Sequence, residues 1–223
     1  MSKQLLIRSA AALLIGVVVI STMALKPKGK KIILFGDSIT QAGVEPGGYV
    51  DLLKKGLEPA GNTVIGAGIG GNKVYDLFLR LEDDVLVKKP DVVVIYVGVN
   101  DVWHKWSSRT GTDQDKFVRF YQALIKKIQA GGAKVVLCTP AVIGEKKPGT
   151  NEMDAELDKY AGEIRKLAAE HQLPLADLRK LFTAYDAANN PQDLEKGILT
   201  TDGVHLNAKG NQTVADAILP LIR

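Results

Sequence analysis

The chain has few of the residues that most alternative chemistries require. Among its 223 residues there is one cysteine, Cys138, which excludes an intramolecular disulfide framework and a cysteine-based zinc site. It has three histidines and six serines, so few side chains can serve as a base or as a hydroxyl nucleophile. Neither the Gly-x-Ser-x-Gly elbow nor a Walker phosphate loop occurs. A hydrolase of the elbow type and a P-loop nucleotide enzyme are therefore disfavoured.

A basic body is also absent, although the formal net charge is +4. Residues 1–31 contain no acid and six basic side chains, namely Lys3, Arg8, Lys26, Lys28, Lys30 and Lys31. The remaining 192 residues carry 29 − 6 = 23 basic and 25 acidic groups, a balance of −2. Nucleic-acid binding needs a clustered basic face, so we expect no nucleic-acid partner.

The N-terminus has the order of an export signal. Residues 9–25 form an uncharged, mostly apolar run that follows Lys3 and Arg8. At 17 residues this run is short for a membrane span, yet an uncleaved anchor stays an alternative. The sequence predicts a signal peptide or N-terminal membrane anchor over 1–25, a short basic linker over 26–30 and one domain over 31–223. We expect an exported protein, either free or tethered to a membrane by this segment, and its oligomeric state is left open.

The body alternates short apolar runs with longer segments of helical period, which predicts an α/β domain around a parallel sheet. With 46% hydrophobic residues it can bury a substantial core. The predicted strands are Lys31–Phe35, Thr63–Ala67, Asp91–Val97, Lys134–Thr139 and Leu173–Asp177. The predicted helices are Tyr49–Leu57, Val74–Lys88, Asp115–Ala130, Glu152–Glu170 and Ala208–Leu221.

Four polar or glycine-rich loops are expected at the carboxyl edge of this sheet, where ligands bind in such folds. Three follow the first three strands, as Gly36-Asp37-Ser38, Gly66 to Gly71, and Gly98-Val99-Asn100-Asp101, and the fourth is Asp202-Gly203-Val204-His205. Each of them alone is compatible with a plain turn or helix cap. Their joint occurrence at one edge favours a catalytic site.

Elimination selects the reactive pair. Only Ser38 directly follows a predicted strand and opens toward a helix, where its hydroxyl would be exposed. Among the histidines, His205 has Asp202 three positions before it, close enough to orient the imidazole. A hydroxyl nucleophile needs such a base, and the base needs such a partner to fix its tautomer.

These residues resemble the four sequence blocks of the SGNH, or GDSL, serine hydrolases, and the resemblance extends over the whole body of the chain. It implies a three-layer α/β/α fold of flavodoxin-like type with a five-stranded parallel sheet, and no cofactor or metal. It also implies a catalytic triad of Ser38, His205 and Asp202. The oxyanion hole implied by the family consists of the Ser38 N–H, a glycine N–H and the Asn100 side chain. We select Gly71 as that glycine, with Gly70 as the alternative.

The resemblance further suggests that Asp37 and Asp101 support the site, and we expect Asp37, Trp103 and His104 to contact substrate. Trp103 and Trp106 would also suit stacking on a sugar ring, although packing of their loop against the body is the alternative that we favour. No long apolar lid is evident, which favours short acyl esters. Together with export, this makes acetyl groups on carbohydrate the preferred substrate, with lysophospholipids and thioesters as alternatives.

Other classes compete with this interpretation. Gly66 to Gly71 satisfies the dinucleotide fingerprint G-x-G-x-x-G, but the acid at the right distance, Asp91, stands at the entry of its strand rather than at the exit. A metal hydrolase would have oxygen ligands but lacks the additional histidines that such sites usually recruit. A silent binding module would have lost a triad member, and all three are present.

Overall fold

Short apolar runs form one parallel sheet in the computed structural model, which describes residues 29–223. The strands are β1 (Lys31–Gly36), β2 (Thr63–Gly68), β3 (Val92–Tyr96), β4 (Lys134–Cys138) and β5 (Leu175–Ala176). β3 is buried along its whole length and β1 along all but its first residue, because helices cover both faces of the sheet. Four of the five predicted strands agree with these bounds to within one residue at each end.

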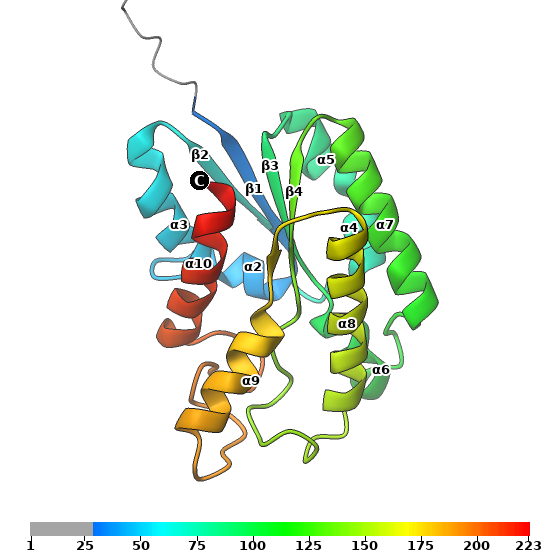
Figure 1. The fold of residues 1–223 in the computed structure, drawn as a ribbon, viewed down its shortest axis with the longest axis vertical. Coiled ribbons are helices and arrows are strands. Elements are labelled where there is room, and N and C mark those ends of the chain that lie inside the picture. The colour runs from blue at the N-terminus through cyan, green and yellow to red at the C-terminus, as the bar shows by residue number, and fades with distance from the viewer. Residues whose placement is uncertain (1–28) are drawn as a thin grey trace, which may run out of the picture.

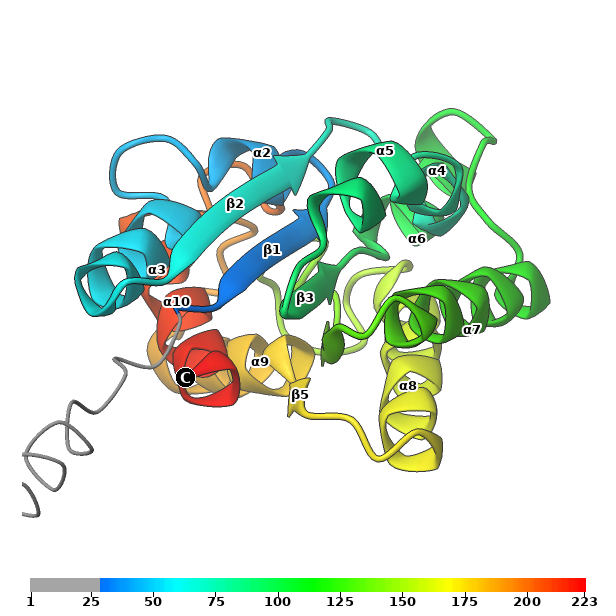
Figure 2. The same cartoon turned by 90° about the horizontal axis from the view of Figure 1, so that it is seen from above.

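Two layers of helices enclose the sheet, with α3 and α10 on one side and α4, α5, α7 and α8 on the other (Figures 1 and 2). The helices are α2 (Ser38–Ala42), α3 (Tyr49–Leu57), α4 (Val74–Leu79), α5 (Leu81–Asp84), α6 (Val99–Ser107), α7 (Gln114–Ala130), α8 (Asp154–Glu170), α9 (Leu178–Asn189) and α10 (Ala208–Ile222), with 3₁₀ turns η1 (Glu58–Ala60) and η2 (Leu86–Lys88). The predicted three-layer α/β/α architecture is confirmed.

The sequence-based assignment of the helices is wrong in two respects. The helix predicted over Val74–Lys88 is divided into α4, α5 and η2, since Arg80 (φ −102°, ψ 8°) and Val85 (φ −126°, ψ −62°) leave helical geometry. In addition, α2, α6 and α9 were not expected as helices. Two of these, α2 and α6, begin at polar loops that follow strands. The same residue types are preferred in turns and at helix N-termini, so the sequence does not distinguish the two.

The strand order β2-β1-β3-β4-β5 fixes where a ligand can approach. The chain moves outward from β1 to β2 and then crosses back to β3, so the loops after β1 and β3 diverge to opposite faces. This is the flavodoxin-like order, in which ligands bind at the carboxyl ends of the strands on either side of that switch point. Ser38 follows β1 and Asn100 follows β3, so both lie at this point.

The predicted export segment 1–25 lies outside the described residues, as does most of the predicted linker 26–30. Within residues 29–223, no helix combines the length and the apolar composition that crossing a membrane requires.

Candidate active site

The hydroxyl predicted to react stands just beyond the end of β1. Ser38 is half-buried and is the first residue of α2, a helix that Asp37 caps by accepting the N–H of Ile39 at 3.0 Å. A side chain at Gly36 would place its Cβ 2.4 Å from the carbonyl oxygen of Tyr96, which only glycine avoids. The tight exit from the strand therefore fixes the position of the serine.

The imidazole of His205 reaches this hydroxyl from a different part of the chain. Its Nε2 lies 3.0 Å from Oγ of Ser38, and its Nδ1 lies 2.7 Å from Oδ2 of Asp202. The other carboxylate oxygen of Asp202 accepts the N–H groups of Val204 and His205 at 3.0 and 2.8 Å. A carboxylate at Nδ1 holds the proton there and leaves Nε2 free to accept one from the serine.

The charge of Asp202 is favoured by these contacts. Partial burial raises the pKa of its carboxyl, but the hydrogen bonds from the side chain and backbone of His205 and from the Val204 N–H outweigh burial and leave the pKa below its ordinary value. An ionised Asp202 at neutral pH can stabilise the imidazolium that forms when Ser38 loses its proton.

The glycine turn after β2 lies beside the serine. A Cβ built at Gly70 would be 3.9 Å from the Cβ of Ser38. The Gly70 N–H donates to Oε1 of Gln41 at 2.7 Å and is thus engaged, which favours Gly71 as the oxyanion donor. Gly71 has φ +74°, a conformation that L side chains rarely adopt.

Asn100 approaches the same turn from the start of α6. Its side chain is 2% exposed, and Nδ2 donates to the carbonyl oxygen of Asn72 at 3.1 Å. An asparagine amide carries two N–H groups, so one remains for an oxyanion after this contact is made. Asn72 follows Gly71 directly, and this hydrogen bond therefore ties two of the predicted oxyanion donors together.

Arg80 was not identified as a site residue from the sequence. It joins the ends of β1 and β2 to the glycine turn. Its guanidinium donates to the carbonyl oxygens of Gly36 at 2.7 Å and Ala67 at 3.0 Å, and to Oδ1 of Asn72 at 2.7 Å. It also pairs with Asp84 at 2.6 Å. In the sequence this arginine lies between Leu79 and Leu81 in a predicted helix, and no local signal distinguishes it from a solvated surface residue.

Two carboxyl groups lie beneath the site. Asp37 and Asp101 are 1% and 0% exposed, and the Val74 N–H lies 3.2 Å from both oxygens of Asp101. Burial raises the pKa of each to about 7, against the opposing hydrogen bonds that they accept. The expected substrate contact by Asp37 is corrected here: its carboxyl is enclosed and caps α2, so it supports the site from within.

The residues after Asn100 divide between two places. Nδ1 of His104 lies 3.4 Å from Nζ of Lys73, and Cε1 lies close to Gly71, so this half-buried histidine flanks the glycine turn. Desolvation, and then the charge of Lys73, lower its pKa. Trp103 and Trp106 instead border a cleft of about 340 Å³ that Asp202 and Val204 also line. Both tryptophans thus share a cleft with Asp202, the predicted partner of His205.

The alternatives lose their geometric basis. β2 runs to Gly68, so Gly66 and Gly68 belong to a strand and form no phosphate-binding turn. Asp91 accepts the N–H of Lys31 at 2.7 Å, at the entry ends of the strands and away from the glycines. In residues 29–223, no group of three or more His, Cys, Asp or Glu side chains is arranged to hold a metal ion.

Comparisons with known proteins also indicate an ester hydrolase of the GDSL type. The profile of the GDSL-like Lipase/Acylhydrolase family matches residues 34–213. The crystal structure of an acetyl xylan esterase, AlAXEase, superposes with a TM-score of 0.84 at 57% identity and covers 86% of this chain and 100% of that one. An acetylxylan esterase of Geobacillus stearothermophilus is 29% identical over 86% of this chain and 93% of its own length. A Bacillus subtilis protein, the uncharacterized lipoprotein YqeF, is 24% identical over 84% of this chain and 87% of its own length.

Solved structures of Axe2, an acetylxylan esterase from Geobacillus stearothermophilus, include three described as catalytic mutants. They replace a serine, an aspartate and a histidine by alanine, and one of them superposes on this chain with a TM-score of 0.75 at 27% identity, covering 89% of this chain and 96% of that one. The three residue types are those that the present structure brings together at Ser38, Asp202 and His205.

Proposed function

Because the chain belongs to the GDSL-like lipase/acylhydrolase family, we propose that this serine ester hydrolase removes O-acetyl groups from xylan-type carbohydrate, with Ser38 as its nucleophile. The observation that carries the proposal is the chain of contacts from Asp202 through His205 to Ser38, at 2.7 and 3.0 Å. The acetyl specificity is supported by the two acetylxylan esterases described above, one of them 57% identical.

The reaction proceeds in two acyl transfers. Oγ of Ser38 attacks the acetyl carbonyl while Nε2 of His205 accepts the hydroxyl proton, and Asp202 stabilises the imidazolium. The tetrahedral oxyanion receives hydrogen bonds from the N–H groups of Ser38 and Gly71 and from Nδ2 of Asn100. Collapse of this intermediate breaks the bond to the sugar oxygen, which takes the proton from His205 and leaves an acetyl-serine.

Water completes the cycle. Nε2 of His205 accepts a proton from the water as its oxygen attacks the acetyl-serine, and the same oxyanion donors stabilise the second tetrahedral intermediate. Its collapse releases acetate and returns the proton to Oγ of Ser38. No step requires a cofactor, and the products are acetate and the free sugar hydroxyl.

The cleft beside Asp202 supports a carbohydrate leaving group. Its lining joins aromatic surface to polar side chains, among them Asn151, Glu152 and Glu195. Trp106 is 55% exposed, so its indole is accessible at this cleft. An exposed indole offers a flat face to a sugar ring, while amide and carboxylate groups accept or donate hydrogen bonds to its hydroxyls.

The test compares acetate release from acetylated xylo-oligosaccharides with hydrolysis of 4-nitrophenyl acetate by the full-length protein. Trp106→Ala is expected to raise KM for the oligosaccharide about tenfold and to leave kcat/KM for 4-nitrophenyl acetate within about twofold, since the small ester does not reach the cleft. The control Leu79→Ala removes an even more exposed apolar side chain, on α4, and is expected to leave the kinetics with both substrates unchanged. Turnover of 4-nitrophenyl decanoate in preference to both acetyl substrates would contradict the proposal.

Export is proposed on the N-terminal sequence and rests on residues 1–25, with 26–30 as a linker and 31–223 as the hydrolase domain. The likeness to a protein named as a lipoprotein supports a place outside the cytoplasm. Fractionation of cells that express the full chain, with mass spectrometry of the protein's N-terminus, distinguishes the alternatives. A start near residue 26 indicates cleavage, an intact N-terminus in the membrane fraction indicates an anchor, and an intact soluble cytoplasmic chain contradicts export.

A further inference from the structure

The base and its partner lie on a segment with almost no regular structure. Residues 190–207 connect α9 to α10, and apart from one isolated bridge between Thr200 and Leu206 they form no strand or helix. Asp202 is half-exposed and His205 one-third exposed at the tip of this segment. Their alignment with Ser38 must therefore come from contacts other than a sheet ladder.

Glu145 supplies most of those contacts. It is 0% exposed, and Oε1 accepts the N–H groups of Leu199 and Thr200 at 2.6 and 2.7 Å, while Oε2 accepts that of Ile198 at 2.8 Å. Three successive backbone N–H groups thus converge on one carboxylate. Hydrogen bonds of this charge-assisted kind are about twice as strong as neutral ones, and here they compensate for the burial of the charge.

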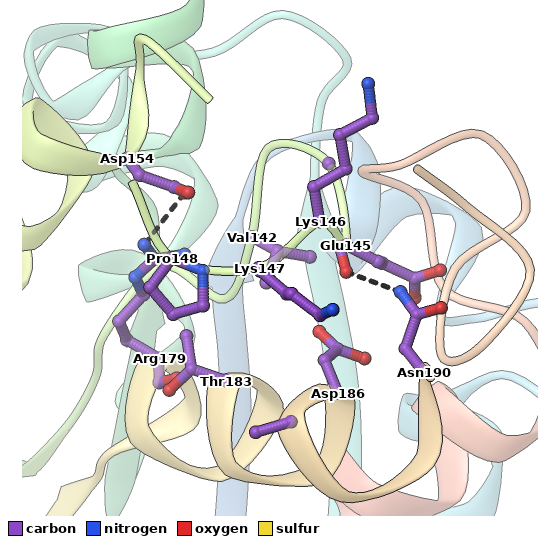
Figure 3. A pocket seen from close by; sticks show the side chains of 12 residues that line it. Val142, Glu145, Lys146, Lys147, Pro148, Asp154, Arg179, Thr183, Asp186 and Asn190 are labelled. Atoms are coloured by element: carbon purple, nitrogen blue, oxygen red, sulfur yellow. Dashed lines mark hydrogen bonds and ion pairs between the residues drawn. The ribbon is translucent and has the colours of Figure 1, made fainter. Parts of the chain in front are cut away.

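The backbone of Glu145 holds the same segment at two more points. Its N–H donates to the carbonyl oxygen of Glu195 at 2.8 Å, and its carbonyl oxygen accepts Nδ2 of Asn190 at 2.8 Å. Figure 3 shows this second contact as Asn190 reaches from the end of α9 toward the loop that carries Glu145. One residue outside the segment therefore fixes its beginning and its middle.

The contacts continue from Glu145 to the reactive pair. Thr200, held by the carboxylate, accepts the Gly203 N–H with Oγ1 at 3.0 Å. The carbonyl oxygen of Gly203 accepts the N–H of Gly144 at 2.7 Å. Gly203 stands between Asp202 and His205, so its position determines how the imidazole meets the serine.

The cavity beside Glu145 is too small to be a ligand site that would account for these contacts. It has a volume of about 10 Å³, room for about one water molecule. Asp186 also faces it (Figure 3), and in the described residues its Oδ1 has no hydrogen-bond partner. Burial, and then the neighbouring charge of Glu145, raise the pKa of Asp186 to about 7. Three buried carboxyl groups, those of Glu145, Asp154 and Asp186, thus line one cavity, and of these only that of Glu145 contacts the 198–200 backbone.

We propose that Glu145 is a positioning residue for catalysis, which holds the segment of Asp202 and His205 at the distance from Ser38 that proton transfer requires. The proposal rests on the triad proposed above. Displacement of a catalytic group by about 1 Å costs up to about 10²-fold in rate. The loss falls on the chemical step, because Glu145 is enclosed and contacts no substrate.

The test compares Glu145→Gln with the matched variant Asp186→Asn, using 4-nitrophenyl acetate and the full-length protein. In Glu145→Gln an amide NH₂ replaces one oxygen and opposes a backbone N–H, so kcat is expected to fall about 10- to 100-fold while KM stays within about twofold. Asp186→Asn removes another buried carboxyl of the same cavity, one that does not contact the 198–200 backbone, and keeps kcat within about twofold. A folded Glu145→Gln protein with wild-type kcat would overturn the proposal.

A second variant covers the case in which Glu145→Gln does not fold. Thr200→Val keeps Glu145 and its three N–H contacts but deletes the oxygen that accepts the Gly203 N–H, so we expect kcat to fall about tenfold at constant KM. Wild-type kcat in this variant would then overturn the proposal. Ser38→Ala, assayed in parallel, distinguishes failure of the proposed triad from failure of the positioning role. If Ser38→Ala keeps its activity, the triad is wrong. If Ser38→Ala is inactive and Glu145→Gln has wild-type kcat, only the positioning role is wrong.

Discussion

The two halves of the active site are held in place by different means. Ser38 and Asn100 lie in the first turns of α2 and α6, the helices that follow β1 and β3, and the register of these two strands pairs Gly36 with Tyr96. Asp202 and His205 lie on the irregular segment 190–207, which is held in position by side-chain hydrogen bonds instead of strand pairing. The strand-held half depends on backbone hydrogen bonds that any sequence of suitable pattern can make, whereas the loop-held half depends on particular residues such as Glu145.

The largest expected effects show both halves acting as one unit. Ser38→Ala and His205→Ala are each expected to reduce kcat by about 10⁴-fold or more, and the double variant to lose little further, because neither group works alone. Steady-state kinetics on 4-nitrophenyl acetate measures all three. His104→Ala is the matched control, since this histidine flanks Gly71 without contacting Ser38, and its kcat is expected within about tenfold of wild type. Additive losses in the double variant would contradict the shared mechanism.

A smaller effect tests whether the strand-held half also contains an indispensable side chain. Arg80→Gln leaves the carbonyl oxygens of Gly36 and Ala67 without their charged donor, so the free energy of unfolding is expected to fall by about 3 kcal/mol. Urea denaturation measures it. The control Arg119→Gln breaks an exposed ion pair with Asp115 on α7 and is expected to cost less than about 1 kcal/mol. Equal losses in the two variants would mean that the sheet alone holds this half.

The smallest effect depends on pH. Burial raises the pKa of Asp101 from 3.8 to about 7, so between these values the folded protein keeps a proton that the unfolded chain has lost. Stability conferred by the neutral form is therefore complete below about pH 4 and is lost as pH rises through 7. Asp101→Asn cannot titrate and can still accept the Val74 N–H. Its Tm relative to wild type is expected to rise steadily from pH 4 to pH 7 and to level off above pH 7, and a difference that stays constant with pH would contradict the assignment.

Much of the strand-held half could be predicted from the sequence. The apolar runs define the strands because they are buried on both faces, and the carboxyl edge of a parallel sheet collects the loops after them. α3 has the predicted bounds, Tyr49–Leu57, since its apolar residues recur with a clear helical period. The scarcity of serine and histidine then selected Ser38 and His205, and the structure places them 3.0 Å apart.

The supporting contacts could not be predicted, for a physical reason. Glu145 and Arg80 act through partners distant in the sequence, and a buried charge has the same local pattern as a solvated one until the fold is known. Helix α9 was missed because its twelve residues follow the very short strand β5, which gives no clear boundary. Asp37 was also expected to contact substrate, but its carboxyl caps α2 and the residue is 1% exposed.

The most direct test of the account is to trap the covalent intermediate. The full-length enzyme is mixed with 4-nitrophenyl acetate, quenched in acid within milliseconds, digested and examined by mass spectrometry. The account predicts one acetyl group per chain, on the peptide that contains Ser38, formed with the first burst of 4-nitrophenol and absent from Ser38→Ala. An acetyl group on another residue, or turnover without any acetylated peptide, would contradict the assignment of Ser38 as the nucleophile.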